Sequence, residues 1–278
     1  MTRPALPVKL TRELGELLEQ RLARLARAVA KQTKTRLTSP KLSDAVPLTL
    51  ALPDIISQLS VLTGAEQAEL ARIGKSLVRH GLEQALKQSP VFSGPIPPGQ
   101  QELFNTLYAD WLKSTADLMT TLPKDSLEQI AQVIVQNPDA TPAELGALLQ
   151  ERLKVGAYEA RNIARQQSDM LAAQSLQARH KSVGVTSYRW RNVGDRRVRK
   201  LHQQREGREF SYAEPPEDGH PGEPWGCRCY AEPVIQGYEA GVTEKLYTFE
   251  PRRDPTPHGA DPLGFLSPPP SWPTRRAA

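Results

Sequence analysis

The sequence of 278 residues predicts a predominantly helical α+β protein, with a helical N-terminal region, a small α+β module and an extended, proline-rich C-terminal arm. Three observations predict this class. Apolar residues recur at three- and four-residue spacings through the first 180 residues, which is the period of helices that bury one face. After Gly184 the spacing changes to two residues, which is typical of strands. The last 28 residues contain eight prolines, which exclude regular secondary structure.

The N-terminal region begins with an amphipathic helix, expected within residues 11–37. Its apolar stripe consists of Leu14, Leu17, Leu18, Leu22, Leu25 and Val29. Such a stripe serves either core packing or docking onto a partner. A second helix is expected over residues 63–88, because Thr63 and Glu66 have the spacing of a capping box and Pro90 follows. A third helix is expected over residues 101–119.

Shorter helices are expected next. Asp125 opens a segment that extends to residue 136, and Thr141 followed by Pro142 is typical of a helix start. The periodicity then predicts one helix over residues 142–155 and another over 157–182.

The α+β module begins with a strand in residues 185–192, where Tyr188 and Trp190 share one face. A helix capped by Asp195 and closed by Gly207 is expected next, followed by short strands within residues 208–214 and 227–235. We therefore expect three domains: a helical docking region (1–122), a module of helices and a small α+β unit (123–236), and the proline-rich arm (237–278).

The module contains both cysteines of the chain, close to two of its five histidines. Two thiolates and two imidazoles suit tetrahedral zinc, so His202, His220, Cys227 and Cys229 are the candidate metal ligands, and Asp195, Trp190 and Arg197 are expected to complete a structural cluster. The C-x-C spacing is shorter than the usual zinc spacing. In the alternative interpretation the thiols are small buried apolar groups, and the histidines bond to Asp195 or to the backbone.

Basic residues gather in two blocks, with net charges of +6 for residues 1–40 and +8 for residues 151–210. Within the second block, the candidates for contact with nucleic acid or an acidic partner are Arg189, Arg191, Arg196, Arg199 and Lys200. No motif for reading bases accompanies them, so any DNA binding is expected to be nonspecific.

Three segments in this order resemble the bacteriophage Mu protein F family of minor head, or head-morphogenesis, proteins: ARNIARQQS (160–168), YRWRNVGDRRVRKLHQQREG (188–207) and HPGEPWGCRCYAEPV (220–234). The resemblance covers roughly residues 125–236. Two departures from the family pattern are the longer spacing between His220 and Cys227, and Gln166 with Gln167 after the Ala-Arg pair.

The resemblance implies a structural protein of a phage or prophage head, not an enzyme, that acts in head morphogenesis near the portal. Its expected partners are portal or capsid proteins and, nonspecifically, packaged DNA. It implies a location in the virion head, with assembly in the host cytoplasm. The alternatives are a zinc-dependent nuclease or other hydrolase, suggested by the Cys/His cluster, and a nonspecific DNA-binding protein.

Membrane association is not expected from the sequence. No apolar run reaches the roughly 18 to 20 residues that cross a bilayer, and the N-terminus lacks the apolar segment of a secretion signal. We therefore expect a soluble protein made in a reducing cytoplasm, where two cysteines do not form a structural disulfide.

Overall fold

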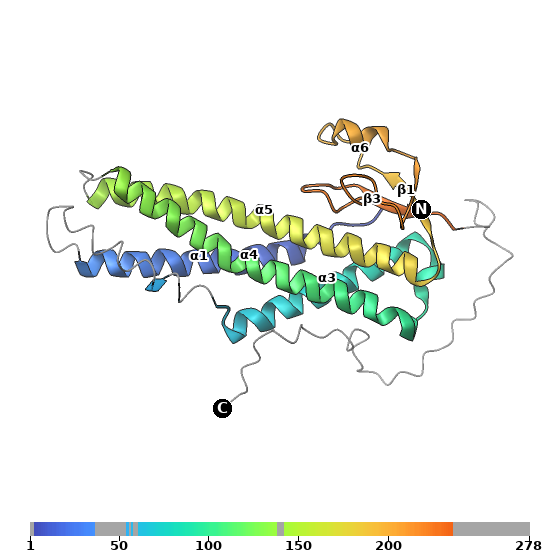
Figure 1. Ribbon diagram of the computed structural model, residues 1–278, viewed down its shortest axis with the longest axis horizontal. Coiled ribbons are helices and arrows are strands. Elements are labelled where there is room, and N and C mark those ends of the chain that lie inside the picture. Colours follow the sequence, from blue (N-terminus) through green and yellow to red (C-terminus); the bar gives the residue numbers. More distant parts are fainter. Residues whose placement is uncertain (1–2, 37–53, 56, 58–60, 138–141, 236–278) are drawn as a thin grey trace, which may run out of the picture. The chain divides into compact units, whose positions relative to one another are not determined.

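The computed structural model describes residues 3–36, 54–55, 57, 61–137 and 142–235. Long helices dominate it (Figure 1), and together with a three-stranded antiparallel sheet they confirm the predominantly helical α+β class. The elements in chain order are α1 (Val8–Arg36), α3 (Gly64–Gln88), the 3-10 turns η2 (Pro90–Ser93) and η3 (Pro98–Gln100), α4 (Gln101–Gln136), α5 (Pro142–Ser182), β1 (Ser187–Arg191), α6 (Lys200–Gln204), β2 (Glu209–Ser211) and β3 (Tyr230–Pro233). The predicted arm (237–278) lies outside the described residues.

The chain forms two compact units. In its described part, one unit contains residues 3–7, 74–111 and 168–235, and the other contains residues 8–73 and 112–167. The domain boundaries expected from the sequence remain a prediction. Among the described helices, none combines the length and the apolar character that spanning a membrane requires.

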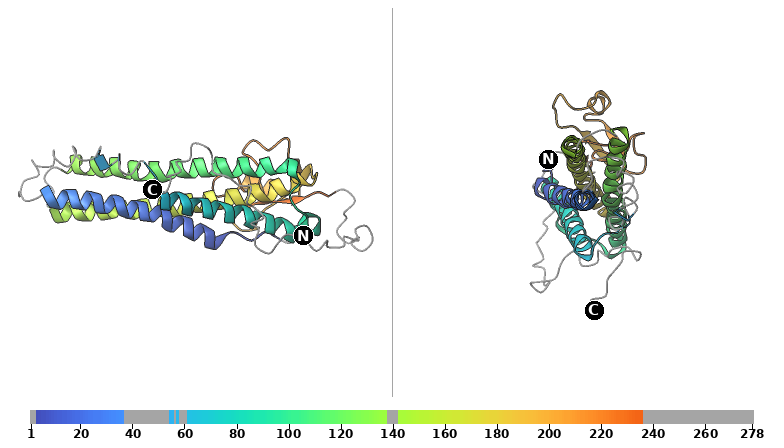
Figure 2. Two further views of the ribbon diagram at one scale, coloured as in Figure 1. Left: turned by 90° about the horizontal axis from the view of Figure 1, so that it is seen from below. Right: turned by 90° about the vertical axis from the view of Figure 1, so that its left-hand side faces the viewer.

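In the unit formed by residues 8–73 and 112–167, α1 lies beside parts of α4 and α5 (Figure 2). The predicted stripe of α1 is buried along its whole length, from Leu14 to Val29. Glycines allow the helices to approach closely: a Cβ on Gly156 of α5 would lie 3.3 Å from Leu22 Cδ1. The stripe therefore packs into the core of this unit.

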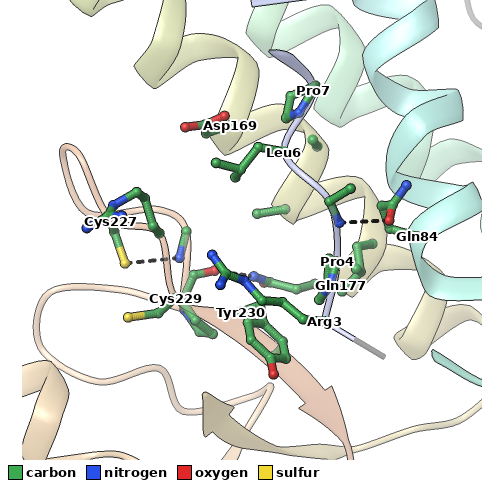
Figure 3. Close-up of a pocket in the computed structure, with 18 of the residues that line it drawn as sticks. Arg3, Pro4, Leu6, Pro7, Gln84, Asp169, Gln177, Cys227, Cys229 and Tyr230 are labelled. Atoms are coloured by element: carbon green, nitrogen blue, oxygen red, sulfur yellow. Dashed lines mark hydrogen bonds between the residues drawn. The ribbon is translucent and has the colours of Figure 1, made fainter. Parts of the chain in front are cut away.

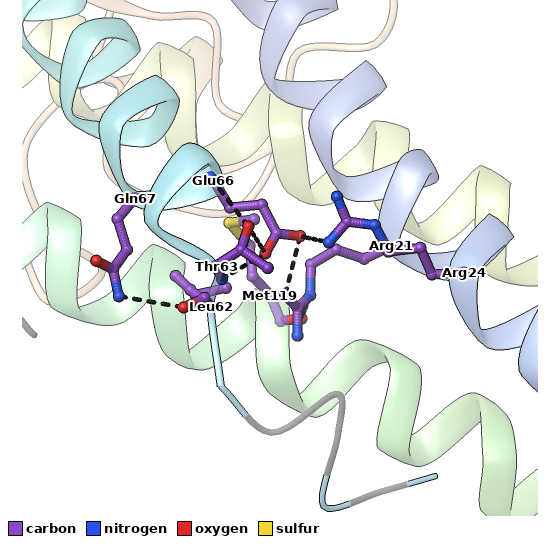
Figure 4. Close-up of polar contacts among 7 residues, drawn as sticks. All are labelled: Arg21, Arg24, Leu62, Thr63, Glu66, Gln67 and Met119. Atoms are coloured by element: carbon purple, nitrogen blue, oxygen red, sulfur yellow. Dashed lines mark hydrogen bonds and ion pairs between the residues drawn. The ribbon is translucent and has the colours of Figure 1, made fainter. Parts of the chain in front are cut away.

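The predicted capping box at the start of α3 is present. Thr63 N donates to Glu66 Oε2 at 2.7 Å, and Glu66 N donates to Thr63 Oγ1 at 3.3 Å. The second oxygen of the same carboxylate accepts from Arg21 Nη1 and from Arg24 Nη1, each at 3.0 Å (Figure 4). The Arg21 and Glu66 side chains are each only 2% exposed, so the cap is also half of a buried ion pair.

Helix α4 runs without interruption to Gln136, so the expected separate helix beginning at Asp125 is wrong. Pro123 lies inside α4 and has no N–H for the carbonyl of Met119, four residues earlier. Arg21 Nε donates to that carbonyl at 2.7 Å and replaces the missing bond (Figure 4). A tertiary contact thus permits a helix that the local sequence argues against.

Helix α5 is likewise one helix of 41 residues, where the periodicity predicted two. The expected break at Gly156 is absent, because this glycine lies within the helix and provides room for the neighbouring Leu22 side chain.

The unit formed by residues 3–7, 74–111 and 168–235 contains the sheet, with strand order β2-β1-β3. Strand β1 pairs antiparallel with both neighbours: Tyr188 lies opposite Phe210 of β2, and Trp190 lies opposite Ala231 of β3. Tyr188 and Trp190 are both fully buried, which confirms the alternation predicted from the sequence. All three predicted strand segments contain strands.

A buried histidine connects the helices of this unit to its sheet. His180, near the end of α5, bonds through Nδ1 to the Tyr212 hydroxyl at 2.7 Å and through Nε2 to Gln88 Oε1 at 2.8 Å. Gln88 in turn donates to the carbonyl of Ala231 in β3 at 2.9 Å. Burial lowers the pKa of His180 to about 3, so the ring is neutral and structural.

The helix expected over residues 195–207 is confined to Lys200–Gln204. Asp195 forms a turn in place of a helix cap, since its Oδ1 accepts from Arg197 N at 3.0 Å and its carbonyl accepts from Val198 N at 3.1 Å. Its carboxylate also binds Arg228. This turn delays the helix until Lys200, and Gly207 ends the segment with φ +72°.

Candidate metal centre

The short helix α6 places His202 in the interior of the module. The side chain is only 2% exposed, and its ring lies edge-on to the buried Trp190 ring of β1, with 5.0 Å between centroids. Leu201 and Gln203 on either side of His202 are exposed, as expected for a single helical turn packed on a sheet. Strand β1 and α6 together fix the position of the imidazole.

The loop that precedes β3 brings both cysteines to that imidazole. Cys227 Sγ and Cys229 Sγ each lie 3.6 Å from His202 Nδ1, and the three donor atoms lie within 4.8 Å of one another. Arg228, between the cysteines, binds Asp195 through two bonds of 2.6 and 2.8 Å. The C-x-C spacing thus directs two sulfurs to one side while the intervening residue pairs elsewhere.

Gly222 shapes this loop. Its φ of +95° favours glycine, and a Cβ at this position would lie only 2.5 Å from Ala173 Cβ of α5. Its N–H donates to Cys227 Sγ at 3.4 Å. The close approach to α5 and the positive φ both require a glycine here.

A carboxylate that the sequence did not suggest orients the imidazole. His202 Nε2 bonds to Asp218 Oδ2 at 2.8 Å, and Arg205 binds the other oxygen of the same carboxylate. Burial opposes ionisation of Asp218, but the bonds from His202 and Arg205 outweigh it and lower the pKa. With its proton on Nε2, His202 presents the lone pair of Nδ1 to the two sulfurs, which is the arrangement of a carboxylate–histidine–metal triad.

The two thiols differ in acidity because they interact with each other. A hydrogen bond from the Cys229 thiol lowers the pKa of Cys227 to about 6, and the neighbouring Cys227 sulfur raises the pKa of Cys229. The buried Trp190 Nε1–H has no hydrogen-bond acceptor at ordinary geometry within the described residues, but it lies near Cys229 and acts to lower the pKa of that thiol against the larger effect of Cys227. A Cys229 thiolate bound to metal would supply that acceptor, so the three donors and their surroundings fit a soft metal ion.

The outer side of the cysteine loop faces the N-terminal segment. Residues 3–7, α3, α5 and the loop enclose a small cavity of about 50 Å³ (Figure 3). Ala5 N donates to Gln84 Oε1 at 2.9 Å, and the Ala5 carbonyl lies 2.8 Å from His80 Nε2. The N-terminal segment therefore supports the loop from behind.

The structure brings together three of the four candidate ligands. His220 is not among them, because its Nδ1 lies 2.9 Å from the Tyr188 hydroxyl. Asp195 binds Arg228, so the carboxylate partner of His202 is Asp218 and not Asp195. Arg197, also expected in the structural cluster, has a side chain that is 78% exposed and lies 3.9 Å from Asp195.

The basic residues differ in their surroundings. Arg189, Arg196 and Lys200 are exposed. Arg191 forms ion pairs with Glu206 and Glu232, and Arg199 donates to the carbonyl of Trp225.

Sequence reasoning missed Asp218, Arg205 and Gly222. Asp218 follows two prolines and another acidic residue in a segment without periodicity, so no pattern distinguished it from a surface carboxylate. Arg205 follows His202 by three residues, a spacing that puts both on the same side of a helix, and this is the available signal for its role.

Together, the fold and the site define a predominantly helical α+β protein with a His/Cys/Cys cluster that could hold a metal ion. Residues 109–232 match the family model described as "Phage Mu protein F like protein", which confirms the resemblance predicted from the motifs of this segment. The segment includes the whole cluster and all of the sheet except Pro233, the last residue of β3. The family indicates a phage head-related protein.

An uncharacterized protein of Haemophilus influenzae strain Rd is 33% identical over 145 residues, which is 51% of this chain. The match spans 32% of that relative, so about a third of its length is represented here. No solved structure matches the chain.

Proposed function

We propose that the protein is a minor structural component of a phage or prophage head that acts in head morphogenesis near the portal. The observation that carries this proposal is the family match over residues 109–232, which includes the metal-ligand cluster and nearly all of the sheet. Portal or capsid proteins are its partners, the virion head is its location, and it assembles in the host cytoplasm. Its role is structural and not enzymatic.

Within this role, the cluster serves as a zinc clamp. His202 belongs to α6, the two cysteines belong to the loop before β3, and Trp190 of β1 packs against the imidazole. A bound Zn²⁺ would supply folding free energy by joining segments that are separated in sequence. The sheet of this module has strands of only three to five residues, so such a cross-link contributes a large part of its rigidity.

The surroundings of the cluster favour a structural role over hydrolysis. The carboxylate nearest to the imidazole, Asp218, already binds His202 and Arg205 and so is not available as a general base in this arrangement. The rival nuclease hypothesis is tested by incubating zinc-loaded protein with DNA and RNA. If the protein cleaves nucleic acid, and if His202→Ala abolishes this cleavage while Ala85→Ser retains it, the nuclease hypothesis would replace the structural proposal.

Nonspecific contact with packaged DNA is part of the proposal. Arg189, Arg196 and Lys200 are exposed and can follow a phosphate backbone. Binding to duplex DNA should weaken steeply with salt, and the slope should become shallower by about one unit per neutralised contact. Binding that is independent of salt would remove DNA from the list of partners.

The decisive experiment follows the protein into particles. Purified virions are analysed by mass spectrometry after cross-linking, and heads are counted after deletion of the gene and complementation. We expect the protein in particles, cross-links to portal or capsid proteins, and restored heads with the wild type and the surface control Lys113→Gln. Absence from particles together with normal heads after deletion would contradict the proposal.

A further inference from the structure

A cavity of about 290 Å³ opens beside the metal-ligand cluster. Two residues of the cluster, His202 and Cys227, form part of its wall, and Trp225, whose side chain is 58% exposed, forms another part. The wall also contains three arginines, Arg197, Arg199 and Arg228. None of the described residues that line the cavity is acidic. The cavity therefore connects a candidate metal position to a cationic, solvent-accessible space.

The cluster offers a metal ion three protein donors, which are His202 Nδ1 and the two cysteine sulfurs. Zinc takes four ligands, and a site with three protein ligands keeps its fourth position for water or another molecule. Two nearby polar groups are engaged elsewhere, since Asp218 binds His202 Nε2 and His220 bonds to Tyr188. The cavities of about 50 and 290 Å³ are both lined by cysteines of the cluster, but only the larger one is also lined by His202, so a fourth ligand can reach the donors from its side.

The charges around the cavity favour an anionic ligand. A divalent metal with two thiolates and a neutral imidazole carries no net charge, so the arginines decide the local potential. Asp195 makes a bidentate ion pair with Arg228 and lies 3.9 Å from Arg197. Arg199 bonds to the uncharged carbonyl of Trp225. One carboxylate therefore neutralises only part of the charge of the three guanidinium groups, and the cavity carries excess positive charge.

Given the proposed metal site, we propose that this cavity binds a phosphate group, with one phosphate oxygen as the fourth metal ligand and the others facing the arginines. A phosphate monoester that binds the metal through one oxygen keeps two further charged oxygens for the guanidinium groups, whereas a carboxylate keeps one. The exposed Trp225 ring offers a surface on which an attached base can stack. The phosphate belongs to a nucleotide or to DNA, as a terminal monoester or as a backbone diester.

The test uses the full-length protein loaded with Co²⁺ in place of zinc. A thiolate-to-cobalt charge-transfer band reports that the cluster binds metal, and the d–d bands report the fourth ligand. Inorganic phosphate is titrated at constant ionic strength. We expect a saturable change in the d–d bands while the charge-transfer band persists. An oligonucleotide with a 5′-phosphate and the same oligonucleotide without it then distinguish a terminal monoester from a backbone diester.

Arg197→Gln and Arg208→Gln form a matched pair. Both remove one exposed positive charge from the same module, but only Arg197 lines the cavity. We expect Arg197→Gln to weaken phosphate binding roughly tenfold, the effect of losing a charge-assisted hydrogen bond, and Arg208→Gln to change it less than about twofold. The charge-transfer band should be unchanged in both variants.

Four results would overturn the proposal. An equal loss in the two variants means that only general electrostatics attracts the anion. Stronger binding of acetate than of phosphate assigns the cavity to a carboxylate. A charge-transfer band without any response to phosphate rejects the phosphate site alone, whereas the absence of that band rejects the metal site as well.

Discussion

Replacement of Cys227 by serine separates a metal clamp from simple packing. The side chain is 5% exposed, and its sulfur lies 3.6 Å from His202 Nδ1 and accepts the N–H of Gly222. A serine hydroxyl at this site is a poor ligand for zinc, and burying it in an apolar core costs on the order of 1 to 2 kcal/mol. This is the whole expected loss if the thiols only pack.

Bound metal adds a second and larger effect. A ligand present at 100 times its dissociation constant stabilises the folded state by about 2.7 kcal/mol. If Cys227→Ser abolishes metal binding, the free energy of unfolding of the metal-loaded protein should therefore fall by about 4 kcal/mol. A chelator should lower it by about 3 kcal/mol in the wild type and leave the variant unchanged.

Urea unfolding with and without a chelator measures both effects, and mass spectrometry of the purified protein measures the metal content. Ala85→Ser is the matched control, because Ala85 is fully buried in the same core cluster as Cys227 but is not a metal ligand. This control should lose stability and keep its response to chelator. If wild type and Cys227→Ser respond equally to chelator, the reasoning is refuted.

Three further predictions concern the scaffold. Arg21→Met should lower the free energy of unfolding by about 2 to 4 kcal/mol, because it leaves the buried Glu66 carboxylate with fewer partners. Arg24 is more exposed, so Arg24→Met should cost less than about 1 kcal/mol. Equal losses for the two variants in urea unfolding would contradict this reasoning. The pKa of the His180 imidazole is about 6.5 in the unfolded chain and about 3 in the folded protein, so between these pH values only the unfolded state binds the proton. Acidification from pH 6.5 towards pH 3 should therefore destabilise the protein by up to about 1.4 kcal/mol per pH unit. His180→Gln should lose this part of the pH dependence. Gly222→Ala should lower the free energy of unfolding by an amount on the order of 3 kcal/mol, because of the φ of +95° and the steric clash of the new Cβ. Gly94→Ala is the control, since a Cβ there meets nothing within 4 Å, and it should be nearly neutral in thermal unfolding.

Local patterns predicted most of the fold. The apolar stripe from Leu14 to Val29, the capping box at Thr63 and the alternation of Tyr188 with Trp190 each follow from the period of a single element, and all three are confirmed. The helix limits were less predictable, since the continuity of α4 through Pro123 depends on a hydrogen bond from Arg21, about a hundred residues earlier. No local rule contains that bond.

The sequence by itself determined that the module is a short sheet with a helix, that its two cysteines and His202 are candidates for one site, and that the segment is related to Mu protein F. Only the tertiary structure decided which groups meet there. It placed Asp218 on His202 and brought His220 to Tyr188, because a loop with glycines at positive φ sets those positions. Periodicity describes which face a residue occupies within one element, whereas the path of a loop depends on close contacts with distant segments, such as that of Gly222 with α5.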